Sequence, residues 1–256
     1  MFLELMSGGK KGGVHCKETG CGGEGQAHLQ ENMGNGGAGT QRGALWWFHL
    51  PLGLEFGLTG STVILNDHQI RAFSEKGMIA PFEQALVREL ENGLPVLSYG
   101  PSSYGYDLRL SAREFLIFRH LPGTVVDPKA FNPKNLESTT LHRDASGAYF
   151  ILPARSYGLG VAVEQLHLPG DVTAICVGKS TYARCGIIAN VTPAEAGWKG
   201  HLTLEFSNSS AADCRIYADE GVVQMLFFQG QPCGTSYRTR QGKYQNQRQR
   251  VTLPKV

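Results

Sequence analysis

Residues 178–186 read GKSTYARCG, and their types suit the binding of phosphate. Gly-Lys-Ser ends a P-loop, but a P-loop also needs a glycine five residues before Gly178, so that backbone N–H groups surround the phosphates. Thr173 holds that position, within an apolar stretch that reads as a strand. The segment therefore does not predict a P-loop. It still offers cationic and hydroxyl groups that bind phosphate oxygens, on Lys179, Arg184, Ser180 and Thr181.

The stretch HLTLEF (201–206) alternates polar and apolar residues, which is the pattern of a half-buried strand. The leucines and the phenylalanine are expected on one face, and His201, Thr203 and Glu205 on the other. A carboxylate so close to a core is costly to bury without a polar partner. Two interpretations of Glu205 remain open: a solvated glutamate on the outer face, or a general acid–base group tuned by partial burial.

The segment YRTRQGKYQNQRQR (237–250) combines two tyrosines with five cations and several glutamines. Three interpretations remain open for it. The first is a disordered and solvated end of the chain. The second is a nucleic-acid-binding segment with interleaved aromatic rings. The third is a flap that folds over a phosphorylated ligand.

Several elements must position these groups. Asn66 or Asp67 is expected to cap a short helix, and Pro81 predicts the start of a second helix over about 81–92. After residue 99 the chain reads as short β-rich runs separated by turns, at a spacing of roughly 10–15 residues that favours an all-β barrel or sandwich. These runs are 124–128, 148–154, 157–169, 171–178, 185–193, 200–208 and 220–228.

The first 62 residues differ in composition from the rest, since 16 of the 33 glycines lie within the first 60 residues. Such a leader has little apolar surface to bury, so we expect it to be disordered; a translation start further downstream is the alternative. Its apolar run 44–58 is too short to cross a membrane. The leader also contains four residues of zinc-ligand type, but the second half of a zinc finger is missing: His15, Cys16, Cys21 and His28.

The overall composition excludes several classes of protein. A net charge of +2 argues against nucleic acid or a membrane as partner. No secretory signal and no run of 18 apolar residues is present, so a cytoplasmic location is expected. The motif pair of the zinc-dependent cytidine deaminases and the G-x-S-x-G of serine hydrolases are also absent.

The run GKSTYARCGIIANVTPAEAGWKGHLTLEFSN (178–208) resembles the signature region of the dCTP deaminases, within the dUTPase-like superfamily. SSYGYDLRL (102–110), EGVVQMLFF (220–228) and GKYQNQ (242–247) resemble other family segments in the same order. The resemblance covers residues 63–256, with a C-terminal flap from about 237. It implies a mainly β fold, a distorted β-barrel with short helices near the start of the domain, and a homotrimer with active sites at subunit interfaces.

The resemblance also implies roles for individual residues. Glu205 would be the general base that deprotonates a water attacking C4 of cytosine, and would pass the proton to N3 and the departing amine. Thr203 and Leu204 match the strand that binds the base. The segment that would contact the triphosphate comprises Lys179, Ser180, Thr181, Tyr182, Ala183 and Arg184. Other matches to nucleotide-binding residues, the last three of them in the flap, are Gln224, Tyr237, Lys243 and Gln247.

The implied reaction is hydrolysis of dCTP to dUTP and ammonia, for dUMP and dTTP supply, with dTTP as a feedback inhibitor. No catalytic metal is implied, and Mg²⁺ would travel with the triphosphate. One feature departs from the family pattern, because AEAGW (194–198) has no aspartate where relatives often carry one. Glu195 replaces it only if its longer side chain reaches the same point. The alternatives are a bifunctional dCTP deaminase and dUTP diphosphatase, and a non-catalytic nucleotide-binding trimer.

Overall fold

The structure is a computed structural model and describes residues 63–119, 121–189 and 193–256. The expectations for the leader, including the zinc-ligand residue types and the run 44–58, lie outside the described residues.

The described part of the chain begins with strand β1 (Val63–Ile64) and helix α1 (Asp67–Glu75). Asn66 caps this helix, as predicted. Its Oδ1 accepts the backbone N–H of Gln69 at 3.0 Å, and the Gln69 side chain accepts the backbone N–H of Asn66 at 3.1 Å. Such a reciprocal capping box satisfies two otherwise unpaired donors. Ile70 then anchors the helix, because it is fully buried in the core.

The predicted second helix over 81–92 is wrong. The segment instead leads into strand β3 (Val87–Glu89), which forms an antiparallel pair with β4 (Pro95–Ser102). Its backbone is bonded to other elements: Glu83 N donates to Tyr106 Oη at 2.9 Å, and Gln84 O accepts from the Arg71 side chain at 2.8 Å. These tertiary contacts override a weak local preference for helix.

Two antiparallel sheets contain the remaining strands. The larger has the order β11-β13-β9-β5-β15-β10-β12 with short strands at its margins, and the smaller has the order β14-β8-β7. The helical turn α2 (Ser180–Ala183) follows β10, and a 3₁₀ turn, Pro133–Asn135, precedes β6. The strands not yet introduced are β2 (Ile79–Ala80), β5 (Gly105–Phe118), β6 (Leu136–Ser138), β7 (His142–Asp144), β8 (Gly147–Leu152), β9 (Tyr157–His167), β10 (Val172–Gly178), β11 (Ile187–Ala189), β12 (Pro193–Ala194), β13 (Lys199–Asn208), β14 (Cys214–Tyr217) and β15 (Gly221–Gln229).

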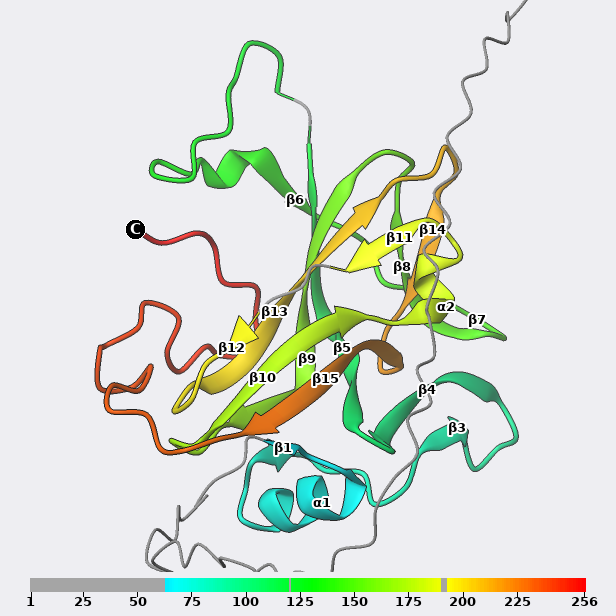
Figure 1. Cartoon of the computed structure of the whole chain (residues 1–256). Helices are drawn as coiled ribbons and strands as arrows, with labels where there is room; N and C mark the ends of the chain where they lie inside the picture. Colours follow the sequence, from blue (N-terminus) through cyan, green and yellow to red (C-terminus); the bar gives the residue numbers. More distant parts are fainter. Residues whose placement is uncertain (1–62, 120, 190–192) are drawn as a thin grey trace, which may run out of the picture. The chain divides into compact units, whose positions relative to one another are not determined.

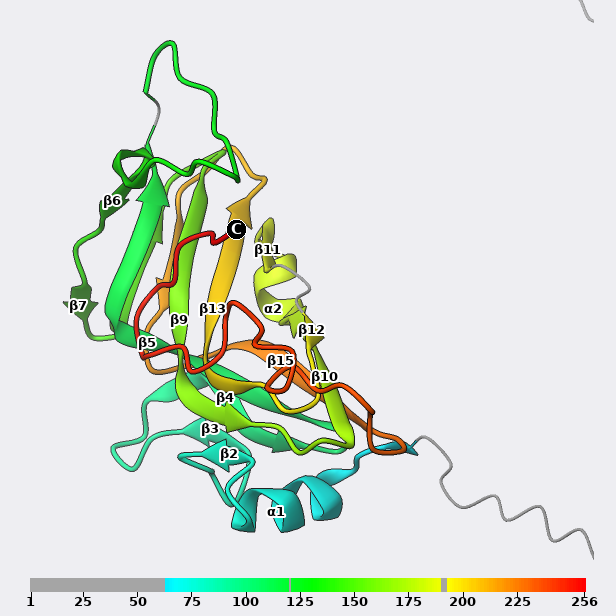
Figure 2. The same cartoon turned by 90° about the vertical axis from the view of Figure 1, so that its left-hand side faces the viewer.

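The large sheet curls about β5. The first half of β5 pairs with β15, as in Tyr106 with Met225, and its second half pairs with β9, as in Leu116 with Leu159. The register shifts between Leu110 and Phe115, where the strand changes partner. The half of the sheet with β9 and β13 therefore faces the half with β10 and β15 (Figures 1 and 2).

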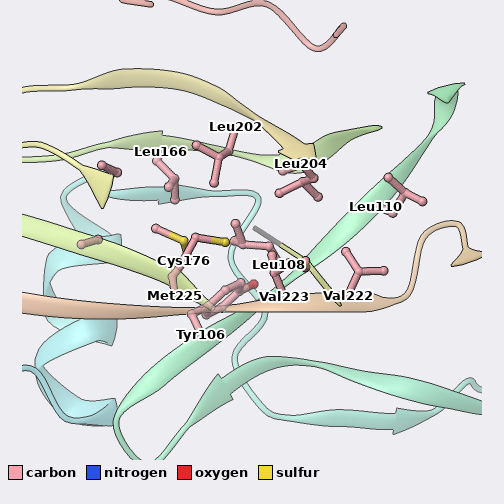
Figure 3. Packing of buried hydrophobic residues seen from close by; sticks show 14 of the residues in the cluster. Tyr106, Leu108, Leu110, Leu166, Cys176, Leu202, Leu204, Val222, Val223 and Met225 are labelled. Carbon is pink, nitrogen blue, oxygen red and sulfur yellow. The ribbon is translucent and has the colours of Figure 1, made fainter. Parts of the chain in front are cut away.

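The core fills the space between these two halves. Figure 3 shows Leu202 and Leu204 of β13 directed toward Leu108 of β5 and Val223 of β15. All four side chains are at most 5% exposed. The core thus fixes one face of β13 and leaves its other face for polar residues.

The predicted mainly β fold with a distorted, barrel-like sheet is confirmed, and six of the seven predicted runs contain strands. The seventh, residues 124–128, contains none. Thr124 N donates to Leu121 O, and the Asp127 side chain accepts the N–H of Lys129. The backbone of this segment therefore forms local turns in place of a strand. None of the helices among the described residues is long and apolar enough to cross a membrane.

Candidate active site

Glu205 lies on the polar face of β13. Burial along this strand alternates as predicted: Leu202 and Leu204 are buried, whereas Thr203 and Glu205 are half-buried on the opposite face. Both Thr203 and Glu205 line a cavity of about 820 Å³. Glu205 is therefore half-buried beside a cavity, and its interpretation as a general acid–base group stays a prediction.

The cavity combines an apolar wall with a few polar groups, as is typical of small-molecule sites. Five residues predicted as site residues line it together: Thr203, Glu205, Tyr237, Lys243 and Gln247. Its apolar and aromatic wall includes Phe118, Phe131, Tyr157, Leu159 and Trp198. The structure thus gathers one strand and the distant C-terminal tail around a single space.

The Glu205 carboxylate influences two neighbouring groups. The pKa of Tyr157, which also lines the cavity, is raised by burial and further by the negative charge of Glu205. The pKa of the buried Cys176 thiol is raised to about 12 by the same two causes, burial being the larger. Glu205 therefore lies close to both groups.

The C-terminal tail packs against the start of β13 and is not a solvated end. Asn246 N donates to Lys199 O at 2.7 Å, and His201 N donates to Gln247 O at 3.0 Å. Further along, Thr252 N donates to Thr203 Oγ1 at 3.1 Å. Figure 2 shows the tail, in red, crossing over β9 and β13. The tail therefore forms one wall of the cavity.

Tyr237 organises the first turn of this tail. Its backbone N–H donates to Ala196 O at 2.8 Å, and its hydroxyl accepts the N–H of Tyr244 at 2.9 Å. The Arg240 guanidinium lies 5.0 Å from the centre of the Tyr237 ring and forms an ion pair with Glu195. This turn is thereby tied to the segment 194–198, where the family aspartate is missing.

Gln247 carries an unsatisfied acceptor. Its Oε1 is one of two buried side-chain polar atoms in the described residues that have no hydrogen-bond partner. A buried acceptor without a donor costs about 1–3 kcal/mol. Gln247 also lines the cavity.

A second group of predicted site residues lies apart from this cavity. Lys179 Nζ forms an ion pair with Asp107 and a 3.0 Å hydrogen bond with Ser98. Gln224 Nε2 donates to Asp107 Oδ1 and to Ser102 Oγ, both at 3.0 Å. Sequence reasoning missed Asp107, although it lies in the quoted segment SSYGYDLRL and a buried strand carboxylate needs a cationic partner.

The remaining residues of the predicted triphosphate segment also stay outside the cavity. Those with exposed side chains are Ser180, Thr181, Ala183 and Arg184. Tyr182 is buried instead: its hydroxyl accepts the N–H of Tyr217 at 2.8 Å, and burial raises its pKa. Tyr182 and the buried Leu204 are therefore able to meet a ligand only through their main chains.

The geometry defines a class of protein, an enzyme-like domain with a half-buried carboxylate beside a ligand-sized cavity. The family model described as dCTP deaminase-like matches residues 64–230. The dCTP deaminase of Alcanivorax borkumensis is 52% identical over 187 residues, covering 73% of this chain and 95% of that protein. The dCTP deaminase of Stenotrophomonas maltophilia is 52% identical over 197 residues, covering 75% of this chain and 99% of that protein. The chain belongs to the dCTP deaminase-like family.

A solved structure titled as the 2'-deoxycytidine 5'-triphosphate deaminase from Agrobacterium tumefaciens is also similar, with 18% identity and a TM-score of 0.44. The match covers 66% of this chain and 48% of that chain.

Proposed function

We propose that this protein hydrolyses dCTP to dUTP and ammonia. The observation that carries the proposal is the position of Glu205 on the wall of the cavity, beside Thr203 and beneath the tail residues Tyr237, Lys243 and Gln247. The activity named for relatives that are 52% identical over nearly their full length supports the same substrate.

The reaction needs one group that accepts a proton and returns it. Glu205 removes a proton from a water molecule as its oxygen attacks C4 of cytosine. It then delivers the proton to N3, and a second transfer lets the C4 amine leave as ammonia, so that dCTP and water give dUTP and ammonia. A carboxylate on the wall of a ligand-sized cavity is placed to act in both steps, since a general base must lie within hydrogen-bond reach of the proton that it takes.

The two groups of site residues support a homotrimeric assembly. A dCTP molecule has a base at one end and a triphosphate at the other, yet the cations of the segment 179–184 do not line the cavity with Glu205. A neighbouring subunit that presents its own Lys179, Ser180 and Arg184 to this cavity supplies the missing phosphate ligands. In this proposal Gln224 acts beside Lys179, and Thr181 and Ala183 contribute from the same turn.

Mg²⁺ enters, in this proposal, bound to the triphosphate as part of the substrate. dTTP would compete for the same site, and the enzyme would act in the cytoplasm. Glu195 lines the cavity and forms an ion pair with Arg240, so a dUTP diphosphatase activity would require this carboxylate to leave Arg240 and act on a water molecule.

One assay tests the activity directly. Purified protein is incubated with dCTP and Mg²⁺, and ammonia, dUTP and diphosphate are measured over time. Equal amounts of ammonia and dUTP without diphosphate support the proposal. Diphosphate in proportion to ammonia would show the bifunctional enzyme, and the absence of ammonia would refute deamination.

A further inference from the structure

A second hollow, of about 510 Å³, adjoins the Glu205 cavity at the C-terminal tail. The two spaces share a wall, because Gln241 and Gly242 line both. We call the second hollow the basic pocket. Its other lining residues are His167, Lys199, Arg238, Gln245 and Asn246.

The charges of the basic pocket are not neutralised within the described residues. Lys199 and Arg238 make none of the ion pairs found there, and no carboxylate lines the pocket. His167 adds an imidazole to the lining. A pocket lined by two cations and no carboxylate has a positive potential, so it favours an anion.

The backbone holds this arrangement in place. Gln245 closes one side, since its Oε1 accepts the N–H of Lys199 at 3.2 Å and its Nε2 donates to Gly197 O at 3.1 Å. Gln241 and Asn246 both have positive φ angles, 55° and 59°, which non-glycine residues rarely adopt. Neither carboxamide side chain bonds to a described residue, so each has N–H donors to offer a ligand.

From this geometry we propose that the basic pocket binds a phosphate-type anion, and that the bound anion ties the tail to β13. Lys199 belongs to β13 and Arg238 to the tail, so one anion between them joins the two elements. Guanidinium and ammonium groups with adjacent carboxamides are the donors that suit phosphate oxygens. The inference goes beyond the deamination reaction, since neither Lys199 nor Arg238 has a part in it. In this proposal the anion in the basic pocket is a second ligand, separate from the substrate, and it keeps the tail in place beside the Glu205 cavity.

Inorganic diphosphate is the probe, and its binding to the full chain is measured by titration calorimetry. The parent protein is expected to bind one diphosphate per chain at this pocket. The double variant K199Q/R238Q should bind it at least about tenfold more weakly, because two charge-assisted contacts are lost. K199R should retain binding. R88Q/K134Q removes two exposed cations elsewhere and serves as the matched control, with affinity expected to be unchanged.

Arg184→Ala distinguishes this pocket from the triphosphate segment. The proposal predicts that R184A still binds diphosphate at the basic pocket, and that diphosphate slows hydrogen exchange over residues 237–247. Loss of binding in R184A with normal binding in K199Q/R238Q would overturn the basic pocket while supporting the proposed triphosphate site. Absence of binding to the parent, or an equal loss in R88Q/K134Q, would also overturn it. Titration of dCTP into the parent and K199Q/R238Q shows whether the pocket takes the phosphates of a nucleotide as well.

Discussion

Gly242→Ala is expected to release the tail from the cavity without unfolding the domain. A Cβ atom at position 242 would lie 2.2 Å from Cε1 and 2.3 Å from Cζ of the Tyr237 ring. That ring has little room to move, because its hydroxyl accepts the N–H of Tyr244 and the Arg240 guanidinium lies over its face. Overpacking of this kind costs about 1–3 kcal/mol. The closed arrangement of the tail should therefore become about 5- to 150-fold less populated relative to the open one.

The measurements are the KM for dCTP, the hydrogen exchange of residues 237–247 and the melting temperature. KM should rise and exchange should quicken, whereas the melting temperature should change little, because the buried core lies in the sheet. Gly234→Ala is the matched control, since a Cβ at position 234 has no atom within 4 Å. Equal KM and equal exchange in the two variants would refute the assignment of this turn as the closing wall of the site.

Arg184→Ala should weaken the binding of dCTP by about ten- to hundredfold and leave deoxycytidine binding nearly unchanged, because a charge-assisted contact to phosphate is worth roughly 1.5–3 kcal/mol. Both affinities are measured by calorimetry. An equal loss for the two ligands would show that Arg184 does not contact the phosphates. Burial raises the pKa of Glu220, whose Oε2 accepts the N–H of Leu97 at 2.7 Å. In an unfolded chain the pKa of a glutamate is about 4.3. Ionisation of Glu220 therefore opposes folding as the pH rises from that value toward the higher pKa of the folded state. Glu220→Gln keeps an acceptor for Leu97 and should gain stability over the parent between pH 5 and pH 8 in urea titrations, and a pH-independent difference would contradict this. A chain that begins at Val63 should deaminate dCTP like the full chain, since the family match starts at residue 64, and loss of activity would assign a role to residues 1–62.

The sequence predicted the parts of the fold that depend on local patterns. Alternation in HLTLEF placed Leu204 in the core and Glu205 on the opposite face, because side chains in a strand point alternately to its two sides. Asn66 identified the start of α1 through its capping group. Pro81 misled the prediction of a helix, because the partners of its segment, Arg71 and Tyr106, are distant in the sequence.

The same limit applies to the site. Resemblance to the family singled out Glu205 and the tail residues, but neither spacing nor composition indicates that the tail returns to β13 and pairs with residues 199–203. The neutralisation of Lys179 by Asp107 was equally hidden, since the two residues are 72 positions apart. Such pairings come from the closure of the sheet and not from any local pattern.

Glu205→Gln tests the central claim most directly, with ammonia release from dCTP as the measurement. The substitution keeps the shape and hydrogen-bonding capacity of the side chain but removes the group that takes a proton from water. General acid–base catalysis contributes about 10²–10⁴ in rate, and one carboxylate here serves two proton transfers, so the loss in kcat should reach or exceed the top of that range. dCTP affinity should change far less than kcat, and the circular dichroism spectrum and the mass of the assembled oligomer should remain as in the parent. Turnover by the E205Q protein within about tenfold of the parent rate would contradict the account, since that loss lies below the catalytic range.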